Sequence, residues 1–201
     1  MKPADRKRIV RAILSSVPGF HEKGRLLAAT PGGRILRGIY LEDSSDPARI
    51  YVWTFVQPLY APASTVVFNF GKRLGGPSKT WSADEANGLI AMVRDEGVPF
   101  FESVSIPESV ASWGFLVGRS DPFAAEAKAY SLVACGRLPD GARALRELAG
   151  SLSSVIPWQV EMQERAESLS ILAETNPPAA LELLASWERE TVAALSIQDM
   201  P

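Results

Sequence analysis

The spacing of apolar residues changes between residues 71 and 82, and this change constrains the fold more than any other feature. From residue 26 to residue 70 apolar side chains tend to alternate, as in the run that places Tyr51, Trp53 and Phe55 on one face. Beyond residue 82 they recur every three or four positions, as Ala180 and Leu184 do. A period of two is typical of strands and a period near 3.6 of helices. The sequence therefore predicts an α+β fold, with an antiparallel β-meander packed by helices and followed by a C-terminal helical bundle.

Residues 4–17 predict an amphipathic helix ahead of the sheet. Ile9, Ile13 and Val17 recur every four positions and form one apolar stripe, while arginine and lysine residues surround it. Such a stripe is what a helix needs to pack on a core. The following Pro18 and Gly19 are expected to end the helix.

About four strands are predicted between residues 26 and 70. They span residues 26–29, 35–41, 50–56 and 65–70. Turn-forming residues separate them, among them a Thr-Pro-Gly-Gly sequence at 30–33 and an acidic stretch at 42–47. Connections this short favour antiparallel neighbours, because a parallel return needs a crossover of a dozen or more residues.

The third predicted strand carries apolar residues on both faces. Its aromatic residues Tyr51, Trp53 and Phe55 share one face, so we interpret it as a central strand covered on both sides. The alternative is that these three rings line a groove.

Helical spacing dominates the rest of the chain. Ser82 with Glu85 three residues later predicts a capping box that opens a helix to about Glu96, and Pro99 is expected to break it. Four further helices are predicted at about 123–134, 145–152, 158–172 and 180–195. Turn-forming residues near 115–122, including Gly118 and Ser120, suggest an α+β domain at 1–118 and a helical region at 119–201 packed on it.

Charge is distributed unevenly along the chain. Residues 1–100 carry 14 basic and 9 acidic residues, whereas residues 101–201 carry 7 and 14, so a net charge of −2 divides into +5 and −7. Such asymmetry suggests a nucleic-acid-binding face or an electrostatically steered protein partner. An uneven surface charge without functional meaning explains it equally well.

The sequence argues against the common catalytic and metal sites. Zinc needs about four ligands, and the chain has one histidine, His21, and one cysteine, Cys135. Glu42, Asp43 and Asp46 lack the spacing of a calcium loop and are interpreted as a solvated turn. No cofactor or metal is expected, and no catalytic residue is assigned. An unfamiliar enzyme that uses His21 remains an alternative.

Two groups of basic residues are candidates for nucleic-acid binding. They are Arg6, Lys7, Arg8 and Arg11 of the first helix, and Lys72, Arg73 and Lys79 of the glycine-rich stretch 71–79. That stretch resembles a phosphate-binding P-loop in its glycine spacing, but Pro77 replaces the essential lysine and removes a backbone donor. A solvated loop and a core-packing helix are the simpler interpretations.

No membrane association is expected, because no apolar run approaches the ~20 residues that cross a bilayer. The basic N-terminus is followed by an apolar stretch too short for a signal peptide. A lone cysteine agrees with a reducing compartment, so we expect a cytoplasmic protein.

The order of elements resembles that of small bacterial proteins of unknown function, some of them related to immunity or defence proteins. The resemblance covers roughly residues 5–115 and includes the strings Trp53–Leu59 and Pro99–Glu102. The sequence around Ala129–Gly136 is also loosely similar to tetratricopeptide helical hairpins, without a clear 34-residue period.

These observations lead to one main hypothesis and two alternatives. The main hypothesis is a non-enzymatic bacterial binding or regulatory protein, associated with immunity or defence, that recognises a protein partner. The alternatives are a nucleic-acid-binding accessory protein that uses the basic residues, and the His21-dependent enzyme.

Overall fold

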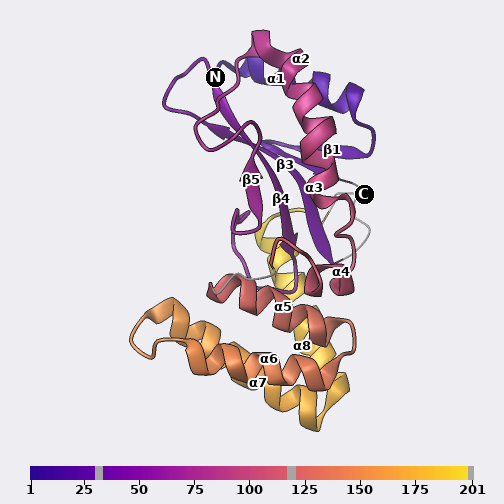
Figure 1. Ribbon diagram of the computed structural model, residues 1–201, viewed down its shortest axis with the longest axis vertical. Coiled ribbons are helices and arrows are strands. Elements are labelled where there is room, and N and C mark those ends of the chain that lie inside the picture. The colour runs from indigo at the N-terminus through magenta and orange to yellow at the C-terminus, as the bar shows by residue number, and fades with distance from the viewer. Residues whose placement is uncertain (30–33, 117–120, 199–201) are drawn as a thin grey trace. The chain divides into compact units, whose positions relative to one another are not determined.

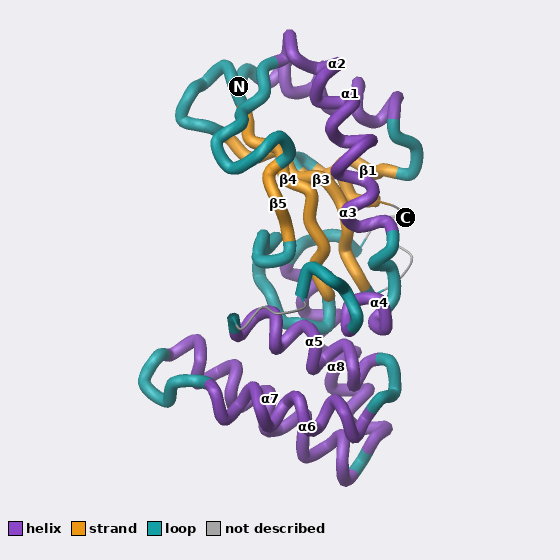
Figure 2. Tube along the Cα trace, viewed as in Figure 1, coloured by secondary structure: helices purple, strands orange, loops and turns teal. Residues whose placement is uncertain are grey.

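The computed structural model describes residues 1–29, 34–116 and 121–198 (Figures 1 and 2). The chain forms two compact units. The sheet unit comprises residues 1–57, 70–105 and 197–201, and the helical unit comprises 58–69 and 106–196. The predicted division was at 118/119, whereas the units divide near residue 105 and the segment 58–69 belongs with the helices. The predicted turn at 30–33 and the boundary residues Gly118 and Ser120 lie outside the described residues.

The described residues of the sheet unit include a five-stranded antiparallel meander with strand order β1-β2-β3-β4-β5, which confirms the predicted fold class. The strands are β1 Phe20–Lys23, β2 Leu26–Ala29, β3 Ile35–Asp43, β4 Ile50–Pro58 and β5 Gly71–Arg73. The register places Leu27 opposite Ile39 and Trp53 opposite Arg73.

Two strands differ from the prediction. The first, β1, was missed because its Phe-His-Glu-Lys sequence is short and polar; Gly24, at a φ of +63°, allows the tight reversal into β2. The predicted strand at 65–70 is wrong, and the last strand is β5, inside the predicted loop 71–79. Alternation in 65–70 misled the prediction because it reports which side chains are apolar, not whether a neighbouring strand is hydrogen-bonded.

One face of the sheet is covered by a helical segment from residue 83 to residue 102. The hydroxyl of Thr54 on β4 donates to the carbonyl of Gly97, at 2.9 Å. A Cβ added at Gly97 would lie 3.3 Å from Cδ1 of Ile39, so this segment packs closely on β3. Residues of β4 two positions apart share a face, so Tyr51 and Trp53 lie on the face opposite Thr54.

This helical segment continues through the predicted break at Pro99. It comprises a 3₁₀ turn at Ala83–Glu85, α2 Ala86–Met92, a π-turn at Val93–Gly97 and α3 Val98–Glu102. The N–H of Val98 donates to the carbonyl of Val93, five residues back. The π-turn widens the helix just before Pro99. Pro99 is the second residue of α3, a position where a backbone N–H is not required, so its missing N–H does not end the helix. The first helix, α1 Pro3–Ser16, buries Ile9, Val10 and Ile13 as predicted.

The helical unit confirms the four predicted helices and adds a short one. Its described helices are α4 Pro107–Ala111, α5 Pro122–Ala134, α6 Leu138–Ser151, α7 Pro157–Thr175 and α8 Pro177–Ala194. Asp121 caps α5 by accepting from the N–H of Ala124 at 3.1 Å, and Asn176 caps α8 through the N–H of Ala179 at 3.3 Å. Figure 2 shows α6 and α7 running side by side.

Helices α5 and α6 pack closely because a glycine lies at their contact. A Cβ added at Gly141 would lie 2.6 Å from Cγ2 of Val133 and 3.0 Å from its backbone nitrogen. Ser131 also lies on α5, and its hydroxyl is 2.6 Å from the hydroxyl of Tyr60 in the core. The segment 58–69 is therefore anchored to α5 by a buried hydrogen bond.

Candidate protein-binding site

The basic residues of α1 divide into paired and exposed ones. Arg6 forms an ion pair with Asp43, and Nη2 of Arg8 lies 3.0 Å from Oδ1 of Asp84. Lys7 and Arg11 are exposed, and neither forms an ion pair within the described part of the chain.

The basic residues at 71–79 are all paired with glutamates of the sheet unit. Lys72 pairs with Glu96, Arg73 with Glu42 and Lys79 with Glu85, at N···O distances of 3.5, 3.1 and 2.6 Å. Neighbouring residues of a strand point to opposite faces, so Lys72 and Arg73 do not present one surface. Five of the seven candidate cations thus have an acidic partner, which lowers the charge available to a phosphate. Nucleic-acid binding stays an alternative hypothesis.

The aromatic residues of β4 enclose a guanidinium of their own chain. The Cζ of Arg73 lies 3.9 Å from the ring centroid of Tyr51 and 4.8 Å from that of Trp53. The carboxylate of Glu42 accepts from Nε1 of Trp53 at 2.8 Å and from Arg73. Phe55 is fully buried, as a core interpretation expects, whereas Tyr51 and Trp53 are half-buried. The Arg73 guanidinium therefore covers the half-buried rings of Tyr51 and Trp53, which are not left open as a groove.

His21, on which the alternative enzymatic hypothesis depends, and the single cysteine lie in different units. His21 lies on β1, opposite Ala28 in the sheet unit. Cys135 follows the last residue of α5 in the helical unit, and its Sγ donates to the carbonyl of Leu132 at 3.3 Å. The thiol thus has a local structural partner, and the structure adds no catalytic geometry to the His21 hypothesis.

The helical unit exposes an aromatic patch, which comprises Phe123, Val155, Ile156 and Trp158. The rings of Phe123 and Trp158 stack with centroids 5.2 Å apart and planes 10° apart. Phe123 is the second residue of α5 and Trp158 the second residue of α7, so the pair joins two helices. The two residues are 37% and 42% exposed, and Val155 is 83% exposed. Large apolar side chains clustered at the surface in this way are typical of interaction sites.

A buried ion pair follows the aromatic patch along the same two helices. Glu126 lies three residues after Phe123 on α5, and Arg165 seven residues after Trp158 on α7. Nη2 of Arg165 lies 3.3 Å from Oε1 of Glu126, whose side chain is 8% exposed. Burial raises the pKa of Glu126 above its usual range, and Arg165 and Tyr130 oppose this only in part.

An aromatic pair completes this row of contacts. Tyr130, one turn after Glu126, is fully buried, and its ring stacks on Trp187 of α8 with centroids 5.3 Å apart. Burial is the main cause that raises the pKa of Tyr130 far above its usual range, and the nearby Glu126 carboxylate is the second cause. The phenol therefore stays neutral. Phe123–Trp158, Glu126–Arg165 and Tyr130–Trp187 thus connect α5 to α7 and α8 in successive turns.

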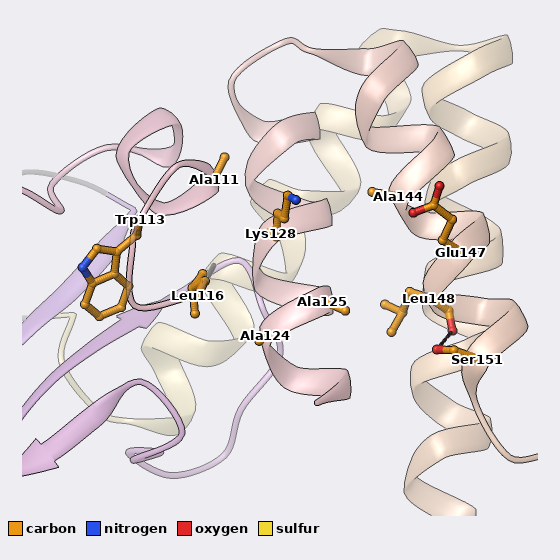
Figure 3. Close-up of a pocket in the computed structure, with 10 residues that line it drawn as sticks. All are labelled: Ala111, Trp113, Leu116, Ala124, Ala125, Lys128, Ala144, Glu147, Leu148 and Ser151. Atoms are coloured by element: carbon orange, nitrogen blue, oxygen red, sulfur yellow. Dashed lines mark hydrogen bonds between the residues drawn. The ribbon is translucent and has the colours of Figure 1, made fainter. Parts of the chain in front are cut away.

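A pocket lies on another side of α5, where this helix faces α6 (Figure 3). It has a volume of about 320 Å³, and small residues form much of its lining. Figure 3 shows Ala125 and Leu148 pointing toward each other across it. Lys128 and Glu147 are the charged residues among those that line it, one from each helix. The volume of the pocket is at the low end for a ligand site. The Ser151 hydroxyl that lines it donates to the carbonyl of Leu148 at 2.7 Å, within α6.

The helices at 123–134 and 158–172 were predicted from the sequence, but no exposed site was predicted on them. Phe123, Ala127 and Tyr130 recur at a spacing typical of one apolar helical stripe, yet the structure leaves Phe123 exposed. Glu126 was not considered, although an acid between Phe123 and Tyr130 on the same helical face is unusual in a buried stripe. The acidic residue within this apolar stripe was the feature of the sequence that could have indicated the site. The pairing of α5 with α7 was not accessible from spacing alone.

No group of three or more His, Cys, Asp or Glu residues suited to a metal ion occurs among the described residues. Among the helices of the described ranges, none combines the length and apolar character that crossing a bilayer requires.

Comparison with known proteins gives no family to which the chain can be assigned: no family model, curated protein or solved structure matches it.

Proposed function

We propose that the chain is a protein-binding module that docks a basic partner protein on the aromatic patch of the helical unit. The observation that carries this proposal is the stacked and exposed pair Phe123 and Trp158. Aromatic residues are enriched in the energetic centres of protein interfaces, because they bury a large area at a low cost in side-chain entropy.

The charge of the helical unit indicates the chemistry of the partner. Its residues 58–69 and 106–196 include 7 basic and 12 acidic residues, for a net charge of −5. The aromatic patch itself has no charged residue, so it is an apolar contact on a unit whose net charge is negative. A partner that presents apolar side chains flanked by lysine or arginine is complementary to both features. A role in immunity or defence rests on the sequence resemblance and on no contact described above.

The test compares two variants of the full chain. Phe123→Ser with Trp158→Ser removes the stacked pair, whereas Ile171→Ser removes an apolar side chain that is 60% exposed on α7 but lies outside the aromatic patch. A photoreactive residue at Val155 captures partners in host cells, and each captured protein is then purified and its Kd measured. We expect the double variant to bind at least about tenfold more weakly and the control to bind within about twofold of wild type.

The ionic strength dependence is part of the same test. Attraction between a basic partner and the acidic unit weakens as salt screens it, so Kd should rise between low and physiological salt. A purified partner that binds the double variant as tightly as wild type contradicts the proposal. So does the absence of any partner captured specifically through residue 155.

A further inference from the structure

A shallow groove between α7 and α8 continues the aromatic patch. Its lining residues are Glu161, Glu164, Arg165 and Ser168 of α7 with Leu183 and Trp187 of α8, and its volume is about 360 Å³. Trp158, Glu161, Arg165 and Ser168 are spaced by three, four and three residues, which places them along one face of α7. A chain that docks on Trp158 can therefore extend directly into the groove.

The groove has an unbalanced negative charge. Glu161 and Glu164 are both exposed, one turn apart on α7, and neither forms an ion pair within the described residues. The positive charge of Arg165 is turned toward the buried carboxylate of Glu126. Helices α7 and α8 together carry seven glutamates and two arginines. Two like charges at this spacing repel, and a cation between them relieves that repulsion.

Trp187 supplies the other half of a cation site. Its ring stacks on the buried Tyr130, which fixes its orientation, and the residue also lines the groove. The face of an indole attracts cations, and the planar guanidinium both stacks on such a ring and pairs with carboxylates through several N–H groups.

From this geometry we propose that the groove binds an arginine side chain of the partner protein, between Trp187 and the carboxylates of Glu161 and Glu164. This inference rests on the proposed function and assigns one specificity-determining contact within it. Glu126 is a positioning residue. Its carboxylate holds the guanidinium of Arg165 and compensates the charge of Arg165 beside the incoming arginine of the partner.

The probe is a capped leucine–arginine–leucine tripeptide, with the citrulline-containing tripeptide as an uncharged match. The readout is the indole N–H resonance of Trp187, which a Trp187→Phe variant assigns. The peptide is titrated to roughly 10 mM, an order of magnitude above the millimolar Kd expected for so short a peptide. We expect a saturable shift with the arginine peptide and binding weaker by about fivefold or more with citrulline.

A matched pair of charge variants separates the local contact from the overall field. Glu161→Gln with Glu164→Gln should weaken arginine-peptide binding by about fivefold or more. Glu167→Gln with Glu190→Gln changes the net charge equally, outside the groove, and should leave the Kd within about twofold. An equal response to both peptides, an equal loss in both variant pairs, or no saturable shift overturns the inference.

The two proposals fail in different ways. If the purified partner loses affinity for the Phe123 and Trp158 variant but not for the Glu161 and Glu164 variant, docking on the aromatic patch stands and the arginine contact is rejected. If the tripeptide binds as expected while no partner depends on Phe123 and Trp158, the groove binds arginine but the proposed docking site is wrong.

Discussion

The carboxylate of Glu126 on α5 meets the guanidinium of Arg165 on α7, with Oε1 and Nη2 separated by 3.3 Å. Glu126 is nearly inaccessible to solvent, whereas a quarter of the Arg165 side chain is exposed. The acid therefore loses more hydration than its partner does. Burial dominates the electrostatics of the pair and raises the pKa of Glu126, against the opposing effect of Arg165.

The raised pKa of Glu126 predicts how stability changes with pH. The folded protein retains this proton at a pH where the unfolded chain has released it, so the contribution of Glu126 to the unfolding free energy falls as pH rises from about 4.5 through the raised pKa. Glu126→Gln removes this dependence. Denaturant titrations of both proteins across this range should show wild type gaining stability relative to the variant as pH falls. A constant difference would contradict the raised pKa.

Glu85 should show the opposite dependence on pH. Its carboxylate accepts from Lys79 and from the backbone N–H and hydroxyl of Ser82, and these bonds lower its pKa to about 2. It therefore contributes stability above its ordinary pKa of 4.5, and this contribution is lost as pH falls toward 2. Wild type should exceed Glu85→Gln in unfolding free energy at neutral pH and converge with it in acid. Glu147→Gln, at an exposed position, is the control.

Two glycines of α6 should respond in opposite directions to the same substitution. A Cβ at Gly141 would come within 3.0 Å of Val133 atoms, whereas a Cβ at Gly150 would meet nothing within 4 Å. We expect Gly150→Ala to raise the unfolding free energy by up to about 1 kcal/mol, the gain in helix propensity. We expect Gly141→Ala to lower it by about 1–3 kcal/mol, because overpacking outweighs that gain. Stabilisation by both substitutions would show that α5 and α6 are not in such close contact.

Arg73 should depend on Trp53 for part of its contribution to stability. The guanidinium lies over Tyr51 and Trp53 and shares the Glu42 carboxylate with the indole N–H. Lysine keeps the charge but not the planar contact, so Arg73→Lys should cost about 0.5–1 kcal/mol of unfolding free energy. A double-mutant cycle with Trp53→Leu measures the coupling between the two residues. Additive effects of the two substitutions would exclude a direct interaction.

Salt dependence should distinguish the nucleic-acid hypothesis from the protein-binding one. If all seven candidate cations met phosphates, log K against log salt would have a slope near −6 on duplex DNA. Because Lys7 and Arg11 alone among the seven lack an ion pair within the described residues, we expect a slope no steeper than about −2. Electrophoretic mobility shifts at several salt concentrations measure it. A slope near −6 would favour the alternative function.

The sequence by itself determined the class of the fold. Strand β4 and helices α1, α5 and α8 follow from apolar periods that local backbone geometry imposes, and the caps at Asp121 and Asn176 obey local hydrogen bonding. The tertiary structure decided which cations are neutralised, because each partner of Arg6, Arg8, Lys72 and Arg73 lies more than 20 residues away. It also decided that Phe123 is exposed beside Trp158 while Glu126 is buried. Periodicity identifies a helical face, but the neighbouring helix decides which part of that face is covered.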